Sequence, residues 1–218
     1  MPSRPVSVAQ MFEVFLKGLA VGFAIAVPVG PIGLLCIRRS MTEGRAAGLA
    51  TGLGAAAADG TYGFLVAAGV AASGLLLSYT TEMQLFGGLL IAVLGVLSAR
   101  AFFQPRPEAA ALAPSRNIAS AFGTTYLLTL SNPMTIIAFT GMIAGLGAAA
   151  GAGGQAAYVL VLGVFLGSAL WWLILVQLAL WARKRLTGNA LKWLDLLAGS
   201  VLILWGLQLA LTAGSGTH

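Results

Sequence analysis

The sequence predicts an all-α polytopic membrane protein: six transmembrane helices that form two inverted three-helix repeats, each with a broken first helix. Of its 218 residues, 59% are hydrophobic and 8% are charged, whereas a soluble domain carries roughly a quarter charged residues. The mean hydropathy is +0.93. Apolar runs of membrane-spanning length recur along the chain, and proline interrupts two of them. Together these observations exclude an ordinary soluble domain and favour helices in lipid.

Six apolar runs have the length that a span needs, which is about 20 residues. They cover residues 15–37, 48–76, 85–103, 118–146, 157–181 and 191–211. The polar stretch 104–117 contains three prolines and is expected to be a cytoplasmic connector. It divides the chain into a first three-helix repeat, 1–103, and a second, 118–218.

Basic residues predict how the spans are oriented. Arg4 and Lys17 lie on one side of the predicted membrane, and ten basic residues lie on the other: Arg38, Arg39, Arg45, Arg100, Arg106, Arg116, Arg183, Lys184, Arg185 and Lys192. The positive-inside rule assigns the ten to the cytoplasm. We therefore expect a multi-pass protein of the inner (plasma) membrane with both termini outside. The basic side chains are expected to anchor this topology and reach the headgroups.

Two of the runs contain a break. Pro28, Gly30 and Pro31 interrupt the first, and Asn132 followed by Pro133 interrupts the fourth. Proline lacks a backbone N–H and its ring clashes with the preceding turn, so it ends a helix. Backbone groups freed in lipid need partners from protein or water, so the breaks are expected to face the interior of the bundle. Secondary transporters place their binding sites at such breaks, which makes these five residues candidate site residues.

The two halves also match weakly in sequence. A shift of 102 residues aligns Gly30-Pro31 with Asn132-Pro133, and a shift of 109 aligns Asp59 with Ser168. Three spans repeated once must be inserted in opposite senses, which is the inverted-repeat pattern of secondary transporters. The alternative is that two prolines fell in similar places by chance.

Asp59 is the one ionisable residue that the sequence places clearly inside a span, about 16 Å along a helix that starts near Gly48. A charged carboxyl is costly at that depth, so we expect it to face the bundle and to be neutral when buried. It becomes charged when water or a cationic substrate reaches it, as a proton carrier or an ammonium-binding group would. The structural alternative is a protonated Asp59 that only holds helices together. Tyr62, on the same helical face, and Ser168 complete the candidate site.

The composition excludes several classes of function. The only histidine is His218 and the only cysteine is Cys36, so no histidine triad, paired-thiol relay or His/Cys metal cluster is expected. We therefore predict no enzyme, no catalytic residue, no metal site and no cofactor. The net charge of +6 reflects membrane orientation rather than nucleic-acid binding.

The chain resembles the LysE/RhtB family of amino-acid exporters. The resemblance rests on Pro28-Val29-Gly30-Pro31, on the segment 38–49 that follows it, on the glycine-rich stretch that ends at Asp59, and on Asn132-Pro133. Valine is inserted into the Pro-Gly-Pro motif typical of the family, and Met134 replaces its lysine. The resemblance implies export of amino acids or similar small solutes, driven by the proton-motive force. It assigns function to Pro28, Gly30, Pro31, Asp59, Asn132 and Pro133.

The expected partners are a small-molecule substrate, protons and the lipid bilayer. Small-xxx-small pairs such as Gly18/Gly22 and Gly163/Gly167 allow close helix contact, either within the chain or in a homo-oligomer. Export of a metal ion or other cation is the alternative function. An intramembrane enzyme is a further alternative, and a purely structural membrane protein would leave Asp59 and the breaks unexplained.

Overall fold

The computed structural model describes residues 7–28, 30–67, 80–103, 117–132, 135, 139 and 155–215. These residues form helices and short turns, with no strand among them, which confirms the all-α class. The elements are α1 (Val8–Ala26), α2 (Pro31–Thr42), α3 (Arg45–Ala67), α5 (Thr80–Arg100), the 3₁₀ turn η2 (Ala101–Phe103), α6 (Ile118–Leu130), α8 (Gln155–Arg183) and α9 (Gly188–Ser215). Three described helices are long and apolar enough to cross a membrane: Val8–Ala26, Ala156–Arg183 and Trp193–Thr212.

The first apolar run is two helices, as the prolines predict. α1 ends at Ala26, and α2 begins at Pro31 with Gly30 as its N-cap residue. The predicted start at residue 15 is wrong, because a capping box between Ser7 and Gln10 starts α1 at Val8. The predicted end at residue 37 is also wrong, since α2 continues to Thr42 and so includes both arginines that were expected in a loop.

A glycine turn joins α2 to α3. Gly44 has a φ of +97°, a conformation that side chains with a Cβ rarely adopt. Its N–H donates to the Arg39 carbonyl oxygen over 3.0 Å, which satisfies one of the last carbonyls of α2. The turn sends α3 back alongside α2.

The second predicted break also ends a helix. α6 stops at Leu130, Ser131 caps it, and the Asn132 N–H donates to the Thr129 carbonyl oxygen over 3.2 Å. Beyond it, Thr135 and Phe139 are helical. Pro133 lies outside the described residues, as do most of the predicted fourth span beyond it and the connector 104–116.

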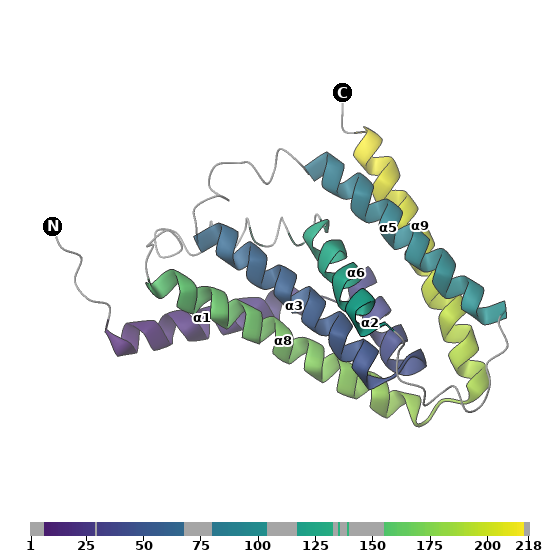
Figure 1. Cartoon of the computed structure of the whole chain (residues 1–218), viewed down its shortest axis with the longest axis horizontal. Coiled ribbons are helices and arrows are strands. Elements are labelled where there is room, and N and C mark those ends of the chain that lie inside the picture. The colour runs from purple at the N-terminus through teal and green to yellow at the C-terminus, as the bar shows by residue number, and fades with distance from the viewer. Residues whose placement is uncertain are drawn as a thin grey trace.

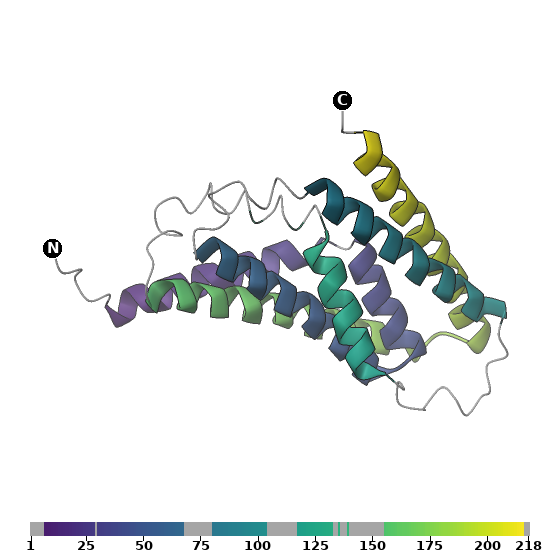
Figure 2. The same cartoon turned by 45° about the horizontal axis from the view of Figure 1, so that its top comes forward.

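The helices form two arms around a central group (Figure 1). α1 packs on α8 in one arm, and α5 packs on α9 in the other. Between the arms, α3 packs on α6 and α8, while α2 contacts α3, α8 and α9. In both views the α2–α3 turn, the C-terminal end of α5 and the α8–α9 turn lie at the same end of the molecule (Figure 2). We call this the basic end, because Arg38, Arg39, Arg100 and Arg183 lie there.

Outward faces of the arms carry large apolar side chains. Exposed examples are Phe86, Leu89 and Val93 on α5 and Leu197, Leu204 and Leu211 on α9. An apolar surface of this extent is typical of contact with lipid. α3 differs, because neighbouring helices cover it and its buried positions are largely Ala and Gly. It is accordingly absent from the three helices identified by hydropathy.

Candidate functional site

A hydrogen-bonded chain of three side chains lies between α3 and α8. Ser168 Oγ donates to Asp59 Oδ2 over 2.6 Å, and Trp172 Nε1 donates to Ser168 Oγ over 3.1 Å. Asp59 is 3% exposed and Ser168 is completely buried. The Ser168 hydroxyl thus donates to the carboxyl and accepts from the indole. The buried Asp59 carboxyl thus has a hydrogen-bond donor on the facing helix.

Small residues of α3 let α8 come close enough for this bond. A Cβ on Gly52 would lie 2.6 Å from the Trp172 Cβ, so only glycine fits there without a shift. Ala55, Ala56 and Ala58 are completely buried on the same helix. The alanine and glycine run before Asp59 therefore brings the carboxyl within reach of the facing helix.

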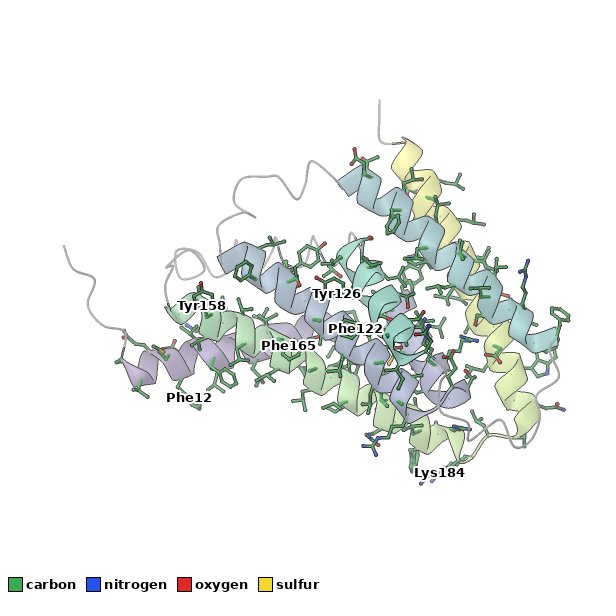
Figure 3. All side chains as sticks on the ribbon, viewed as in Figure 1. Phe12, Phe122, Tyr126, Tyr158, Phe165 and Lys184 are labelled. Carbon is green, nitrogen blue, oxygen red and sulfur yellow. The ribbon has the colours of Figure 1, made fainter. Side chains whose placement is uncertain are left out.

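Tyr62 connects the helix of Asp59 to the second break. Its hydroxyl donates to the carbonyl oxygen of Leu130, the last residue of α6. Its ring stacks on Phe139, with centroids 5.4 Å apart. The tyrosine therefore occupies one of the carbonyls that the end of α6 leaves without an intrahelical donor. Nearby, Thr61 Oγ1 and Tyr126 OH lie 3.1 Å apart, and Figure 3 shows Phe122 and Tyr126 on α6.

The first break borders the same core. Ala26 ends α1 and Ile32 is the second residue of α2, and both belong to the buried apolar cluster that contains Ala55, Ala56 and Trp172. The Leu34 N–H donates to the Gly30 carbonyl oxygen over 3.0 Å. The N–H groups before it have no acceptor within the helix, so the start of α2 carries partial positive charge.

The structure thus gathers most of the predicted site residues around one core. Asp59 bonds Ser168, Tyr62 bonds the end of α6, Pro31 is buried at the start of α2, and Gly30 and Asn132 are partly buried. Pro28 lies at the first break but is exposed. Pro133 falls outside the described residues.

The expectation that Asp59 is the one ionisable group inside a span is wrong. Arg39 is 7% exposed and Asp195 is fully buried. Arg38 Nε donates to Asp195 Oδ1 over 2.8 Å and so joins α2 to α9, while its Nη1 lies 3.3 Å from Glu43 Oε1. Burial of Asp195 is tolerated because it is paired with a guanidinium.

A helical pattern in the sequence could have revealed both buried charges. Arg39 follows Ile32 and Cys36 at seven and three residues, so it shares their buried face. Asp195 precedes Ala198 and Leu202 at three and seven residues, and both are buried. For Arg39, this pattern outweighs the expectation that basic residues only anchor the topology.

Comparison with known proteins places this arrangement in a family. The family model described as LysE type translocator matches residues 23–213. The chain belongs to the LysE type translocator family. Both breaks, Asp59 and Ser168 fall inside the matched region, and the resemblance read from the sequence is confirmed. Membership of a translocator family and three apolar helices of membrane-spanning length make this a membrane protein of the transporter class.

One curated relative is similar over most of its length. The chain is 24% identical over 196 residues to the "Putative amino acid efflux protein YcgF" of Bacillus subtilis (strain 168), covering 89% of this chain and 93% of the relative. No solved structure matches the chain.

The part of the chain that the structure describes contains no group of three or more His, Cys, Asp or Glu side chains that could hold a metal ion. An apolar hollow does adjoin the site, between α3 and α8. It is lined by Leu49, Gly52, Leu53, Ala169, Trp172 and Leu173. These side chains offer no charged group with which to orient a polar solute.

Proposed function

We propose that this protein exports amino acids or similar small solutes across the plasma membrane in exchange for protons. The observation that carries the proposal is the Asp59–Ser168 hydrogen bond, buried in the core between the two broken helices of a LysE family member. The name of its Bacillus subtilis relative, an amino acid efflux protein, supports the class of substrate.

The proposed architecture is an inverted repeat of residues 1–103 and 118–218 joined by the cytoplasmic connector 104–117. The helix pairs support it. α1 packs on α8 as α6 packs on α3, so the first helix of each repeat contacts the second helix of the other. α3 packs on α8, and α5 packs on α9, so second helices pair with each other and third helices do the same.

Close backbone contacts repeat the same relation. A Cβ on Gly163 would lie 2.5 Å from the carbonyl oxygen of Phe15 in α1, and a Cβ on Gly54 would strike that of Phe122 in α6. Gly163 follows Gly54 by 109 residues and Phe122 follows Phe15 by 107. In each repeat, a glycine of the second helix therefore meets a phenylalanine carbonyl of the other repeat's first helix, which supports a pseudo-two-fold relation between the repeats.

The third helices of the repeats follow the same rule. A Cβ on Gly88 would lie 2.7 Å from the Gly206 carbonyl oxygen, and one on Gly206 would lie 2.5 Å from that of Gly88. Gly95 and Gly199 meet in the same reciprocal way, at 2.8 and 2.7 Å. Gly199 follows Gly88 by 111 residues, and Gly206 follows Gly95 by the same number. Each repeat therefore contributes the same pair of glycines to these contacts.

Asp59 and Ser168 are themselves counterparts at a shift of 109 residues. Because they bond each other, the pair lies where the proposed axis passes between α3 and α8. A group on such an axis borders both repeats whichever side of the membrane is open, as a midplane site for alternating access requires.

In the proposed mechanism, the N-terminus of α2 holds the carboxylate of the solute. Its first N–H groups, which have no acceptor within the helix, and its helix dipole favour an anion, and nothing lies within 4 Å of a Cβ built on Gly30. Asp59 carries a proton, or pairs with the amine of the solute, and exchanges one for the other. The basic end faces the cytoplasm by the positive-inside rule, with both termini outside.

The test is counterflow and proton-driven efflux in proteoliposomes, using a panel of labelled amino acids. We expect at least one amino acid to exchange, and an inward proton gradient to accelerate its efflux. The asparagine of Asp59→Asn cannot take up or release a proton. The variant should therefore keep counterflow, but the acceleration of efflux by the gradient should fall by at least about tenfold, equivalent to ~1.4 kcal/mol.

The matched control is Glu13→Gln, which neutralises an exposed carboxyl on α1 that pairs with Lys17. It should leave both activities unchanged. The proton role of Asp59 is wrong if Asp59→Asn keeps the full response to the gradient. Absence of counterflow for every amino acid, with the protein verified as folded and reconstituted, would overturn the amino-acid assignment.

A further inference from the structure

Arg39 presents a buried guanidinium to neutral oxygens alone. From the last turn of α2, its Nη1 donates to Thr51 Oγ1 (3.2 Å), the Ala121 carbonyl oxygen (3.0 Å) and Thr125 Oγ1 (3.1 Å). Its Nη2 donates to Thr124 Oγ1 over 3.0 Å. Within the described ranges no carboxylate lies at ion-pair distance from Arg39, whereas the adjacent Arg38 has two. Glu43 attracts Arg39 electrostatically but forms no ion pair with it. A buried cation without a carboxylate in contact is costly, so the site is suited to receive an anion.

The three hydroxyls around Arg39 have a second partner each. Thr51 Oγ1 donates to the Ala47 carbonyl oxygen (2.8 Å), Thr124 Oγ1 to that of Ser120 (2.7 Å) and Thr125 Oγ1 to that of Ala121 (2.9 Å). Each hydroxyl therefore keeps its own bond when the guanidinium leaves. Arg39 can exchange these acceptors for another without leaving a donor on α3 or α6 unsatisfied.

A carboxylate is the acceptor that best fits this guanidinium. It binds the planar fork through two oxygens, and bonds between charged groups are roughly twice as strong as neutral ones. The site also borders the outside of the bundle. Thr124 is only partly buried, and residues 118–120 at the start of α6 are exposed. An anion that approaches the basic end thus meets Arg39 behind a single turn of α6.

We propose that Arg39 is the group that binds the carboxylate of the transported solute at the basic end of the protein. The oxygens of Thr51, Thr124, Thr125 and Ala121 occupy it while the site is empty. This inference rests on the proposed function, since it needs a solute with a carboxylate. The start of α2 lies eight residues from Arg39, or about 12 Å along the helix. One helix therefore bears both proposed carboxylate sites.

The experiment compares counterflow of the labelled amino acid in proteoliposomes under competition from the unlabelled amino acid and from its amide, which lacks the carboxylate. The wild type should prefer the amino acid. Arg39→Gln should raise KM by about tenfold or more and abolish that preference, because a lost charge-assisted bond is worth at least this much. Arg39→Lys keeps the positive charge but lacks the planar fork, so its KM and its preference for the amino acid should lie between those of the wild type and of Arg39→Gln.

Thr124→Val separates binding from a structural role. It removes one neutral acceptor that competes for Arg39, so KM for the amino acid should fall several-fold. If Arg39 served only to hold helices together, the same change would leave KM unchanged or raise it. This variant also keeps the inference testable if Arg39→Gln does not fold.

The outcomes separate this inference from the proposed function. Suppose that the wild type shows counterflow and that folded Arg39→Gln has the same KM and the same preference for the amino acid over its amide. This result overturns the role of Arg39 and leaves amino-acid export standing. An unchanged or raised KM in Thr124→Val also counts against it. If the wild type exchanges no amino acid at all, the proposed function fails and the carboxylate site fails with it.

Discussion

Removing the Ser168 hydroxyl should change the pH at which the protein works. Ser168→Ala deletes the donor that bonds Asp59 Oδ2 over 2.6 Å and leaves the carboxyl buried. The charged form loses its hydrogen bond, while the neutral form loses less because it needs no donor. Protonation of Asp59 then becomes easier, and the pH profile of proton-coupled efflux should move to higher pH.

The size of the shift follows from the contact. A hydrogen bond to a charged group contributes about 1.5–3 kcal/mol, and ~1.4 kcal/mol corresponds to one pH unit. The Ser168→Ala profile should therefore lie about 1–2 pH units above that of the wild type. Ser168→Thr keeps a hydroxyl at the same place and should stay near the wild-type profile.

The assay is efflux from proteoliposomes under a fixed proton gradient, with internal and external pH varied together. Ser98→Ala is the control, since it deletes a buried serine hydroxyl of α5 whose partner is the Asp195 carbonyl oxygen at 3.4 Å. It should leave the profile unchanged. A Ser168→Ala protein that is less stable but titrates like the wild type would refute the reasoning, because the bond would then be structural only.

Two further predictions concern glycines. Gly163→Ala and Gly54→Ala each drive a Cβ against a backbone carbonyl, so both should lower the unfolding temperature in detergent by several degrees. A Cβ on Gly123 meets nothing within 4 Å. Gly123→Ala should therefore raise the unfolding temperature slightly, since alanine favours a helix by about 1 kcal/mol over glycine. If all three variants lower the unfolding temperature equally, the close contacts of α1 with α8 and of α3 with α6 do not determine the stability. Gly30 also has nothing within 4 Å of an added Cβ and an ordinary φ of −103°, so Gly30→Ala should keep the unfolding temperature. It should nevertheless raise KM several-fold if the solute approaches the backbone there; an unchanged KM would remove the start of α2 from the binding site.

The sequence predicted those features that depend on local chemistry. The first break followed from its prolines, because no neighbouring helix can restore a missing N–H to Pro31. α6 likewise ends just before Asn132-Pro133. Burial of Asp59 also followed from its position, since a carboxyl in the middle of an apolar run has to face protein.

Features that depend on tertiary contacts were harder to predict. A pair of adjacent arginines after an apolar run is usually a loop anchor, and only the neighbours of α2 show that Arg39 faces inward and that Arg38 meets Asp195. The role of Trp172 likewise depends on its neighbour one helical turn earlier, since its Nε1 donates to Ser168. Helix boundaries moved where capping groups such as Ser7 and Gly44 outweighed hydropathy.

The unlike chemistry of Asp59 and Ser168 bears on how a duplicated chain could evolve. In a symmetric dimer of identical three-helix units, the position on the axis would hold two copies of one residue. Two carboxyls at 2.6 Å could not both ionise, and two hydroxyls would carry no charge to trade for a proton. Joining both units in one gene removes that constraint, because each copy can then mutate alone. In the proposed repeat, the acid and its hydroxyl partner thus have separate roles that a symmetric dimer of identical units could not hold.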